Sequence, residues 1–120
     1  MIVKLNKASP KQGVTVLQLT GSIHSGPDCR RLEQETDSLI AAVGRAFVIL
    51  DLSDVSHMDS AAIGSIARCY SRLKVSGGFL RLAGCKGMVD ASLRLTQLHK
   101  VLEIYPTASA AMENYPPQPF

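Results

Sequence analysis

The spacing of hydrophobic and polar positions divides this chain into short strands and amphipathic helices. Strands are expected where apolar residues alternate with polar ones or form short unbroken runs between turn residues. These stretches are residues 1–5, 14–20, 47–52 and 79–83, with a short edge strand built from Leu98, Val101, Leu102 and Ile104. The run F-V-I-L at residues 47–50 is typical of a strand covered on both faces.

The segments between the strands carry apolar residues at spacings of three and four, which predicts helices. The first helix begins at S-G-P-D, with Ser25 as its N-cap and Pro27 in its first turn, and it ends at Gly44. Its buried face is expected to contain Leu32, Thr36, Leu39, Ile40 and Val43. Its opposite face is expected to be solvated and carries Arg30, Arg31, Glu33, Gln34 and Asp37.

Three further helices are predicted. The second begins at Ser60, where Asp59 and Ser60 are both good N-cap residues, and it ends at S-G-G, residues 76–78. Its inward positions are Ile63, Ile66, Ala67, Tyr70 and Leu73. The third covers residues 86–96, and its inward positions are Met88, Ala91 (or Ser92) and Leu95. A short last helix starts at Pro106 and Thr107, and its contact face is Ala108, Ala111, Met112 and Tyr115.

The resulting order of elements is β-β-α-β-α-β-α-β-α. Strands that alternate with helices form right-handed crossovers and a parallel sheet, while the first two strands are close enough to form an antiparallel hairpin. The predicted fold class is therefore α/β, a mixed, mostly parallel sheet with an N-terminal antiparallel hairpin and about four packed helices. Residues 1–115 are expected to form one domain, and the proline-rich residues 116–120 a disordered tail.

Length and composition agree with one globular domain. The chain has 120 residues, of which 46% are hydrophobic and 19% charged, and this balance argues against disorder. No apolar run approaches the roughly 20 residues that a membrane-spanning helix needs. The first residues also lack the features of a signal peptide. We therefore expect a cytoplasmic protein without membrane insertion.

Charge and reactive side chains argue against several classes of function. The net charge is +3, and the basic residues are scattered without interleaved aromatics, which does not favour nucleic-acid binding. The cysteines at positions 29, 69 and 85 are odd in number and far apart, which favours free thiols. The three histidines form no metal-binding pattern. We expect neither a metal nor another cofactor.

The most informative stretch is residues 47–64, F-V-I-L-D-L-S-D-V-S-H-M-D-S-A-A-I-G. A buried strand leads through a short loop to Asp59 and Ser60, and so places a hydroxyl at the N-terminus of a helix. Ser60 has no histidine and acid suitably placed to activate it, and the G-x-S-x-G segment of many serine hydrolases is absent. Glycine motifs for nucleotide phosphates are absent as well. We therefore expect that the protein is not an enzyme.

Asp51 suggests one alternative. A strand that ends in an aspartate is similar to the phospho-acceptor arrangement of response-regulator receiver domains. That chemistry needs Mg²⁺ and an acidic pair after the first parallel strand. The corresponding segment, T-G-S-I-H at residues 20–24, contains no acid, and no lysine follows the last strand. Asp51 is better interpreted as a strand-end residue that binds loop amides.

Asp59 and Ser60 have two interpretations. The simpler one is an ordinary helix N-cap. The other adds phosphorylation of Ser60 by a partner kinase, which would place nearly two negative charges beside Asp59. The helix N-terminus tolerates an anion, whereas a partner surface shaped for a neutral hydroxyl would be repelled. This interpretation predicts a switch in binding with little change of fold.

Residues 14–112 resemble the STAS domain family and, within it, the stand-alone bacterial anti-sigma-factor antagonists. The similar segments are V-L-Q-L-T-G-S-I (16–23), V-I-L-D-L-S-D-V-S-H-M-D-S-A-A-I-G (48–64), S-G-G-F-L-R-L-A-G (76–84) and L-R-L-T-Q-L-H-K-V-L-E-I-Y (93–105). Their order and spacing together carry the resemblance. It implies the same mixed sheet with packed helices.

The resemblance also implies a site and a partner. In antagonists of this type, the serine after the aspartate of D-S-[ST]-G is phosphorylated by an anti-sigma factor that is a serine kinase. The unphosphorylated antagonist binds that factor and so regulates transcription indirectly. Ser60 matches the phosphorylated serine, and the implied partner surface consists of His24, Ser25, Met58, Asp59, Ser60, Ile63 and Gly64. The sequence is also compatible with a homodimer.

Two departures from the family pattern bear on this function. Ala61 and Ala62 stand where the family usually has Ser or Thr and then Gly, and His24 stands where many members have an acid. The alanines favour the helix and remove a second hydroxyl. The alternative function is a STAS regulatory or scaffold subunit of another complex, for example a lipid-transport ABC system, with no phospho-switch.

Overall fold

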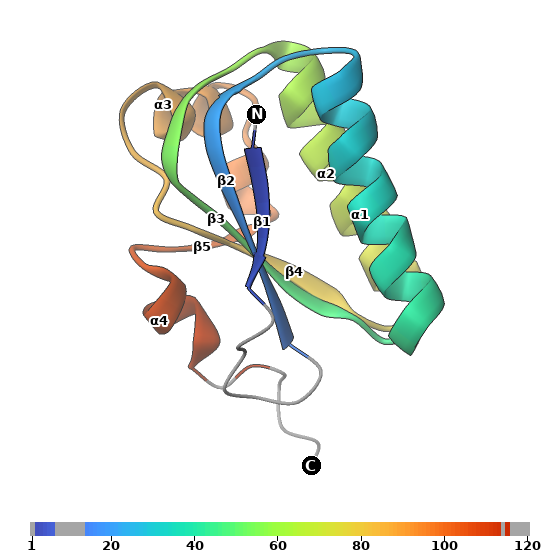
Figure 1. Ribbon diagram of the computed structural model, residues 1–120. Helices are drawn as coiled ribbons and strands as arrows, with labels where there is room; N and C mark the ends of the chain where they lie inside the picture. The colour runs from blue at the N-terminus through green and yellow to red at the C-terminus, as the bar shows by residue number, and fades with distance from the viewer. Residues whose placement is uncertain (1, 7–13, 114, 116–120) are drawn as a thin grey trace.

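The computed structural model describes residues 2–6, 14–113 and 115. One sheet contains the strands in the spatial order β1 (Ile2–Asn6), β2 (Val14–Ile23), β3 (Phe47–Met58), β4 (Phe79–Ala83) and β5 (Glu103–Tyr105) (Figure 1). β1 pairs antiparallel with β2, whereas each later neighbour pair is parallel. The predicted fold class, with its N-terminal antiparallel pair, is confirmed.

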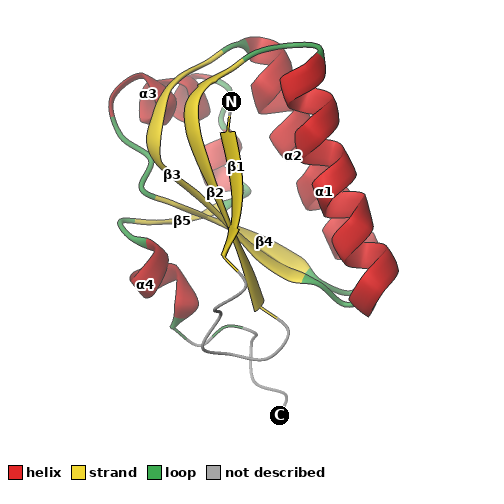
Figure 2. Ribbon diagram, viewed as in Figure 1, coloured by secondary structure: helices red, strands yellow, loops and turns green. Residues whose placement is uncertain are grey.

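Over the described residues, four α-helices pack against this sheet. Figure 2 shows α1 (Pro27–Val43) and α2 (Ser60–Val75) side by side on one face of the sheet, with α4 (Ala108–Met112) on the other. α3 (Gly87–Leu95) packs beside the last part of β3 and is followed by a 3₁₀ turn, Leu98–Lys100. No helix in the described ranges has the length and apolar character that crossing a membrane requires.

The core has two parts, because β3 is covered on both faces over its first half. Val48, Leu50 and Leu52 belong to the larger cluster, which lies beneath α1 and α2. Ile49 points the other way, into a smaller cluster with Ala111 and Tyr115. The alternation agrees with the period of two in a strand, and it explains why the F-V-I-L run is apolar at every position.

Both central strands continue further than the sequence predicts. The loop expected after Leu52 is wrong, because β3 runs to Met58 and stays paired with β2 up to the pair Ile23 and Met58. The register of this pairing shifts twice, between Gln18 and Thr20 and between Gly21 and Ser22. The second half of β3 is polar because much of it faces solvent. A polar stretch of this kind is also typical of a loop, and for that reason the sequence pattern predicts one here.

Three details of the helices also differ from prediction. Gly26, rather than Ser25, is the N-cap of α1, and no side chain caps it there. Val43 is exposed. In α3 the buried residues are Val89 and Leu93, whereas Met88 and Leu95, which were predicted to face inward, are 61% and 86% exposed. In a helix of only nine residues, two apolar stripes one position apart fit the sequence equally well.

The C-terminal segment confirms one prediction and corrects another. Leu98 lies in a 3₁₀ turn, so the edge strand is restricted to Glu103–Tyr105. The expected contact face of the last helix is correct, since Ala111 and Tyr115 are buried and Ala108 and Met112 pack against the same cluster. Residues 7–13, which connect the two strands of the predicted hairpin, and the predicted tail over residues 116–120 lie outside the described residues.

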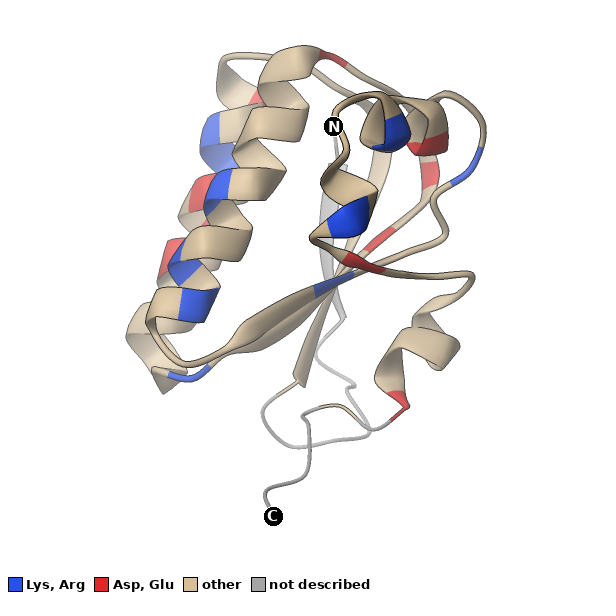
Figure 3. Ribbon diagram, turned by 180° about the vertical axis from the view of Figure 1, so that it is seen from behind, with Lys and Arg blue, Asp and Glu red and all other residues tan. Residues whose placement is uncertain are grey.

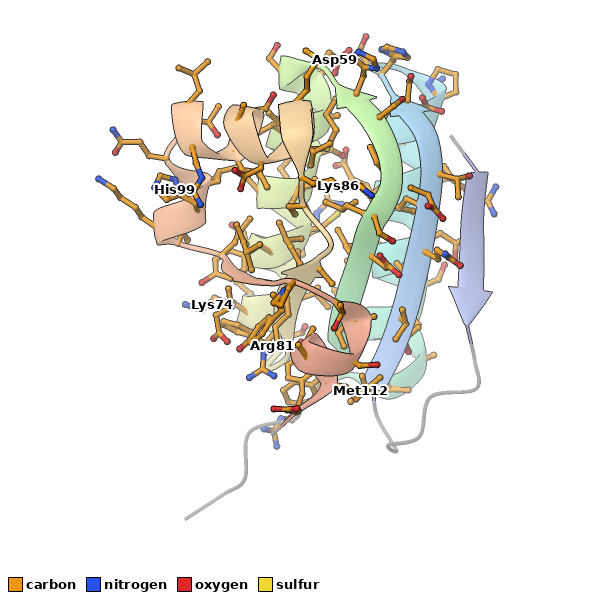
Figure 4. All side chains as sticks on the ribbon, turned by 90° about the vertical axis from the view of Figure 1, so that its left-hand side faces the viewer. Asp59, Lys74, Arg81, Lys86, His99 and Met112 are labelled. Carbon is orange, nitrogen blue, oxygen red and sulfur yellow. The ribbon has the colours of Figure 1, made fainter. Side chains whose placement is uncertain are left out.

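Arg81 of β4 ties this C-terminal segment to the sheet (Figure 4). Its Nη1 donates hydrogen bonds of 2.9 Å to the carbonyls of Ala111 and Glu113. The guanidinium also lies over the Tyr115 ring, 4.2 Å from its centroid. This buried cation is therefore accounted for by packing and needs no functional explanation.

Candidate functional site

The candidate site lies where β2 and β3 end and α1 and α2 begin. Because Ile23 and Met58 pair at the ends of two parallel strands, the two loops that follow them are neighbours. The backbone N–H of Asp59 donates a hydrogen bond of 3.3 Å to the carbonyl of Ile23. Figure 4 shows Asp59 at this end of the molecule, with Arg81 and Met112 at the opposite end.

The Asp59 carboxylate joins both loops. Its Oδ1 accepts a hydrogen bond of 2.8 Å from the N–H of Ala62 and so caps α2. Its Oδ2 accepts a second one of 2.9 Å from the N–H of Ser25. The Ala62 amide, then the Ser25 amide and, less strongly, the charge of His24 lower the pKa of Asp59 from its ordinary value. Asp59 is therefore an anion at neutral pH.

The loop between β2 and α1 is held at several points. His24 Nδ1 lies 3.8 Å from Asp59 Oδ2, and the His24 side chain is 61% exposed. The N–H of His24 donates to Asp28 Oδ2 at 3.0 Å, and this bond lowers the pKa of Asp28. The thiol of Cys29 donates to the carbonyl of His24 at 3.3 Å. The loop therefore presents His24 and Ser25 in one defined arrangement.

Ser60 is the first residue of α2 and is exposed. Within the described part of the chain, its hydroxyl has no hydrogen-bond partner. Ala62, two positions later, is fully buried in the main core cluster. The methyl group of Ala62 is thus a packing contact, while the Ser60 hydroxyl is available to another molecule.

The structure brings the predicted partner residues together but exposes them unequally. His24, Ser25 and Ser60 are exposed, and Met58, Asp59 and Gly64 are half-buried. Ile63 is 6% exposed. The surface available at this end is therefore mainly that of the loop and the first turn of α2, and the binding role of these residues remains a prediction.

Asp51 lies away from this end and binds its own strand. Its Oδ1 accepts hydrogen bonds from the N–H and the hydroxyl of Ser53, at 3.0 and 2.7 Å. The prediction that Asp51 ends its strand and binds loop amides is wrong, because β3 continues to Met58 and the amide that Asp51 binds belongs to Ser53 of the same strand. Within the described residues, histidine, cysteine and acidic side chains form no cluster that could hold a metal ion. Cys29, Cys69 and Cys85 are free thiols.

One charged network was missed by sequence reasoning. Glu33 of α1, predicted to be solvated, is half-buried against α2 and accepts a hydrogen bond of 2.7 Å from the buried Ser65 hydroxyl. It also accepts from Arg68 and lies 3.3 Å from Arg72, which pairs further along with Asp37. Arg68 and then Ser65 lower the pKa of Glu33.

Figure 3 shows these acids and bases interspersed along the α1–α2 edge. The signal in the sequence is the matched spacing of four between Glu33 and Asp37 and between Arg68 and Arg72. Residues four apart share a helix face, so two such pairs on neighbouring helices can meet in register.

Comparisons with known proteins place this fold in a family. The model of the STAS domain family matches residues 7–111, so the chain belongs to the STAS domain family. A Thermotoga maritima protein, named as a candidate anti-sigma factor antagonist, is 39% identical over 66 residues. That alignment covers 55% of this chain and 58% of the relative, little more than half of each.

Solved structures of other proteins are similar in fold to this chain over most of its length. The crystal structure of a candidate anti-sigma factor antagonist from Thermotoga maritima is similar with a TM-score of 0.79 and 25% identity, over 94% of this chain and 92% of that one. The Bacillus cell fate determinant SpoIIAA in its phosphorylated form gives a TM-score of 0.73 at 15% identity, over 94% and 98% of the two chains. At that identity the second likeness concerns the fold alone.

Proposed function

We propose that this protein is an anti-sigma-factor antagonist whose partner is an anti-sigma factor resembling a serine kinase. The observation that carries the proposal is the Ser60 hydroxyl, which is exposed at the start of α2 beside the loop that Asp59 fixes in place. The partner surface in this proposal comprises His24, Ser25, Met58, Asp59, Ser60, Ile63 and Gly64. Membership of the STAS family and the names of the relatives support the same role.

In the unphosphorylated state, the surface is neutral at Ser60 and rigid. Asp59 holds Ser25 and Ala62 through hydrogen bonds of 2.9 and 2.8 Å, so that little loop ordering is needed when a partner docks. The free hydroxyl can donate to or accept from a partner group. We propose that this form binds the anti-sigma factor and thereby frees the sigma factor.

Phosphorylation reverses that state in the proposal. The Ser60 oxygen forms a bond to the γ-phosphorus of ATP on the kinase, ADP leaves, and the hydroxyl proton is lost. The product carries nearly two negative charges beside the Asp59 carboxylate. Burying this dianion against a surface shaped for a hydroxyl is costly, so the partner dissociates. The helix N-terminus accommodates the anion, so the fold persists.

Phosphorylation and binding can be tested separately. Wild type, Ser60→Ala and Ser56→Ala are incubated with the candidate anti-sigma kinase and ATP, and phosphate is located by mass spectrometry. Ser56 is also exposed but lies on β3, so Ser56→Ala is the matched control. We expect one phosphate on wild type and on Ser56→Ala, and none on Ser60→Ala. Phosphate on Ser60→Ala would contradict Ser60 as the site.

Calorimetric titration of the same partner then tests the switch. We expect Ser60→Ala to bind about as tightly as wild type, and Ser60→Asp to bind at least tenfold more weakly, because it introduces a charge that must be desolvated. Equal binding of wild type and Ser60→Asp would argue against the switch. It would favour the alternative function, a regulatory or scaffold subunit of another complex.

A further inference from the structure

Arg68 has one nitrogen that the ion network between α1 and α2 does not use. Its Nε and Nη2 donate hydrogen bonds of 3.1 and 3.3 Å to the two carboxylate oxygens of Glu33. Within the described residues, Nη1 has no hydrogen-bond partner. The Arg68 side chain is 53% exposed, so this nitrogen is accessible from solvent. Glu33 therefore fixes the guanidinium while leaving one donor group free.

Gly64 lets this free nitrogen approach the Ser60 end of α2. A Cβ atom built on Gly64 would lie 3.5 Å from Arg68 Nη1, so the guanidinium lies over the glycine. Ser60, Gly64 and Arg68 are spaced by four, and residues at that spacing are neighbours on one helix face. Side chains on a helix also lean toward its N-terminus. Arg68 therefore extends from its own turn back toward the turn that begins with Ser60.

We infer that Arg68 binds the phosphoryl group of phosphorylated Ser60 through Nη1. The inference rests on the proposed function, which supplies the phosphorylation. Neighbouring Cβ positions four residues apart are separated by about 5–6 Å. The phosphoryl group is attached through rotatable Cα–Cβ, Cβ–Oγ and Oγ–P bonds, so it can turn across that distance toward a nitrogen already above Gly64. Guanidinium groups are well suited to phosphate, and this one keeps its two bonds to Glu33 while it binds.

This contact would govern the charge balance of the phosphorylated site. The acids around the proposed phosphate are Asp59, the N-cap of α2, and Asp28 and Glu33 of α1, and each disfavours its dianionic form. Arg68 and His24 are the bases on the same two sides. Without Arg68, the phosphate would lie beside the Asp59 carboxylate and lack this fixed cation. With Arg68, the group is held on the protein's own surface.

The experiment needs no kinase. Phosphoserine is introduced at position 60 during translation into wild type, Arg68→Gln and Arg72→Gln, and its second pKa is measured by ³¹P NMR titration. Arg72 pairs with the same Glu33 but lies one turn further from Ser60, so Arg72→Gln is the matched control. A fourth chain, Gly64→Leu, keeps the arginine and occupies the space below Nη1. Circular dichroism verifies that each chain is folded.

We expect the phosphoserine pKa to be lower in wild type than in Arg68→Gln by about 0.2–0.7 pH unit, because a neighbouring cation favours the dianion. Arg72→Gln should match wild type, and Gly64→Leu should shift toward Arg68→Gln. Equal pKa values in wild type and Arg68→Gln, or equal shifts in both arginine variants, would overturn the inference. Because the phosphate is installed directly, failure of a kinase to modify Ser60 would leave this result unaffected.

Discussion

The Asp59 carboxylate accepts a hydrogen bond of 2.9 Å from the N–H of Ser25, although the two residues are separated by 34 positions in the sequence. The same carboxylate caps α2 through the N–H of Ala62. One side chain thus fixes both the helix that presents Ser60 and the loop that presents His24. The candidate surface therefore depends on Asp59 for its shape as well as for its charge.

Replacing Asp59 by alanine should lower stability in a way that depends on pH. At neutral pH we expect the melting temperature to fall by roughly 4 °C, as for the loss of a helix N-cap in a domain of this size. The folded protein lowers the pKa of Asp59 below its ordinary value of 3.8. The stabilisation is therefore complete well above pH 3.8 and is lost as the pH falls through the lowered value.

Thermal unfolding of wild type and Asp59→Ala from about pH 7 to about pH 2 tests this expectation. The difference in melting temperature should narrow at the acid end, even though both chains lose stability there. Asp54→Asn serves as the control, because Asp54 is exposed and, among the residues that the structure describes, makes only a long hydrogen bond of 3.4 Å to Gln18. If the difference in melting temperature between wild type and Asp59→Ala stayed constant down to low pH, the charge of the carboxylate would not contribute to stability.

Glu33→Ala should destabilise the packing of α1 on α2. The substitution removes the shorter of the two hydrogen bonds of the buried Ser65 hydroxyl and leaves it the 3.3 Å bond to the carbonyl of Cys29. A weakened buried polar group costs about 1–2 kcal/mol of unfolding free energy, which urea denaturation can measure. Glu35→Ala is the control, because within the described part of the chain Glu35 pairs only with Arg31 on its own helix. Equal losses in the two variants would contradict a special role for Glu33.

Tyr115→Phe should destabilise the chain far more than Tyr105→Phe. The Tyr115 hydroxyl accepts a hydrogen bond of 3.1 Å from the N–H of Val48 and donates one of 2.7 Å to the carbonyl of Phe79. Its removal leaves buried backbone groups unpaired, which costs about 2 kcal/mol. The Tyr105 hydroxyl donates to the exposed Glu103 carboxylate, so Tyr105→Phe should stay within about 0.5 kcal/mol of wild type. Urea denaturation of both variants decides the comparison.

Alanine substitutions in α3 test which of its two apolar stripes is buried. Leu93 is fully buried and Leu95 is 86% exposed. We expect Leu93→Ala to cost about 2–5 kcal/mol, because it leaves a cavity, and Leu95→Ala to change stability by less than about 0.5 kcal/mol. Chemical denaturation of both variants measures the difference. A larger loss for Leu95→Ala would restore the helix orientation that the sequence alone predicts.

Much of the fold could be predicted because its signals are local. The apolar run that starts at Phe47 and the cap at Asp59 specify their elements from a few adjacent residues. The second half of β3 could not be predicted, because residues 53–58 are polar and their pairing with β2 is a long-range relationship. The prediction of which face of α3 is buried was wrong for a related reason. Met88 and Val89 are both apolar, and only packing against the rest of the protein determines which of them is buried.

The candidate site shows the same division. The position of Ser60 and Asp59 at a helix start could be predicted, because the helix N-cap and the family motif each consist of adjacent residues. The bond from Ser25 to Asp59 and the contacts among Glu33, Ser65 and Arg68 could not. They join residues that are more than 30 positions apart. The spacing of hydrophobic residues within one helix or strand carries no information about such contacts.

The sequence by itself thus determined the α/β class, the order of the elements and the position of an exposed serine at a helix start. Hydrophobic periodicity and capping act within one element, and each can be recognised without knowing its neighbours. Only the tertiary structure decided how far β2 and β3 stay paired, which face of α3 is buried, and that Arg68 lies over Gly64. Those features depend on packing between helices and strands that are distant in the sequence, and this packing exists only in the folded chain.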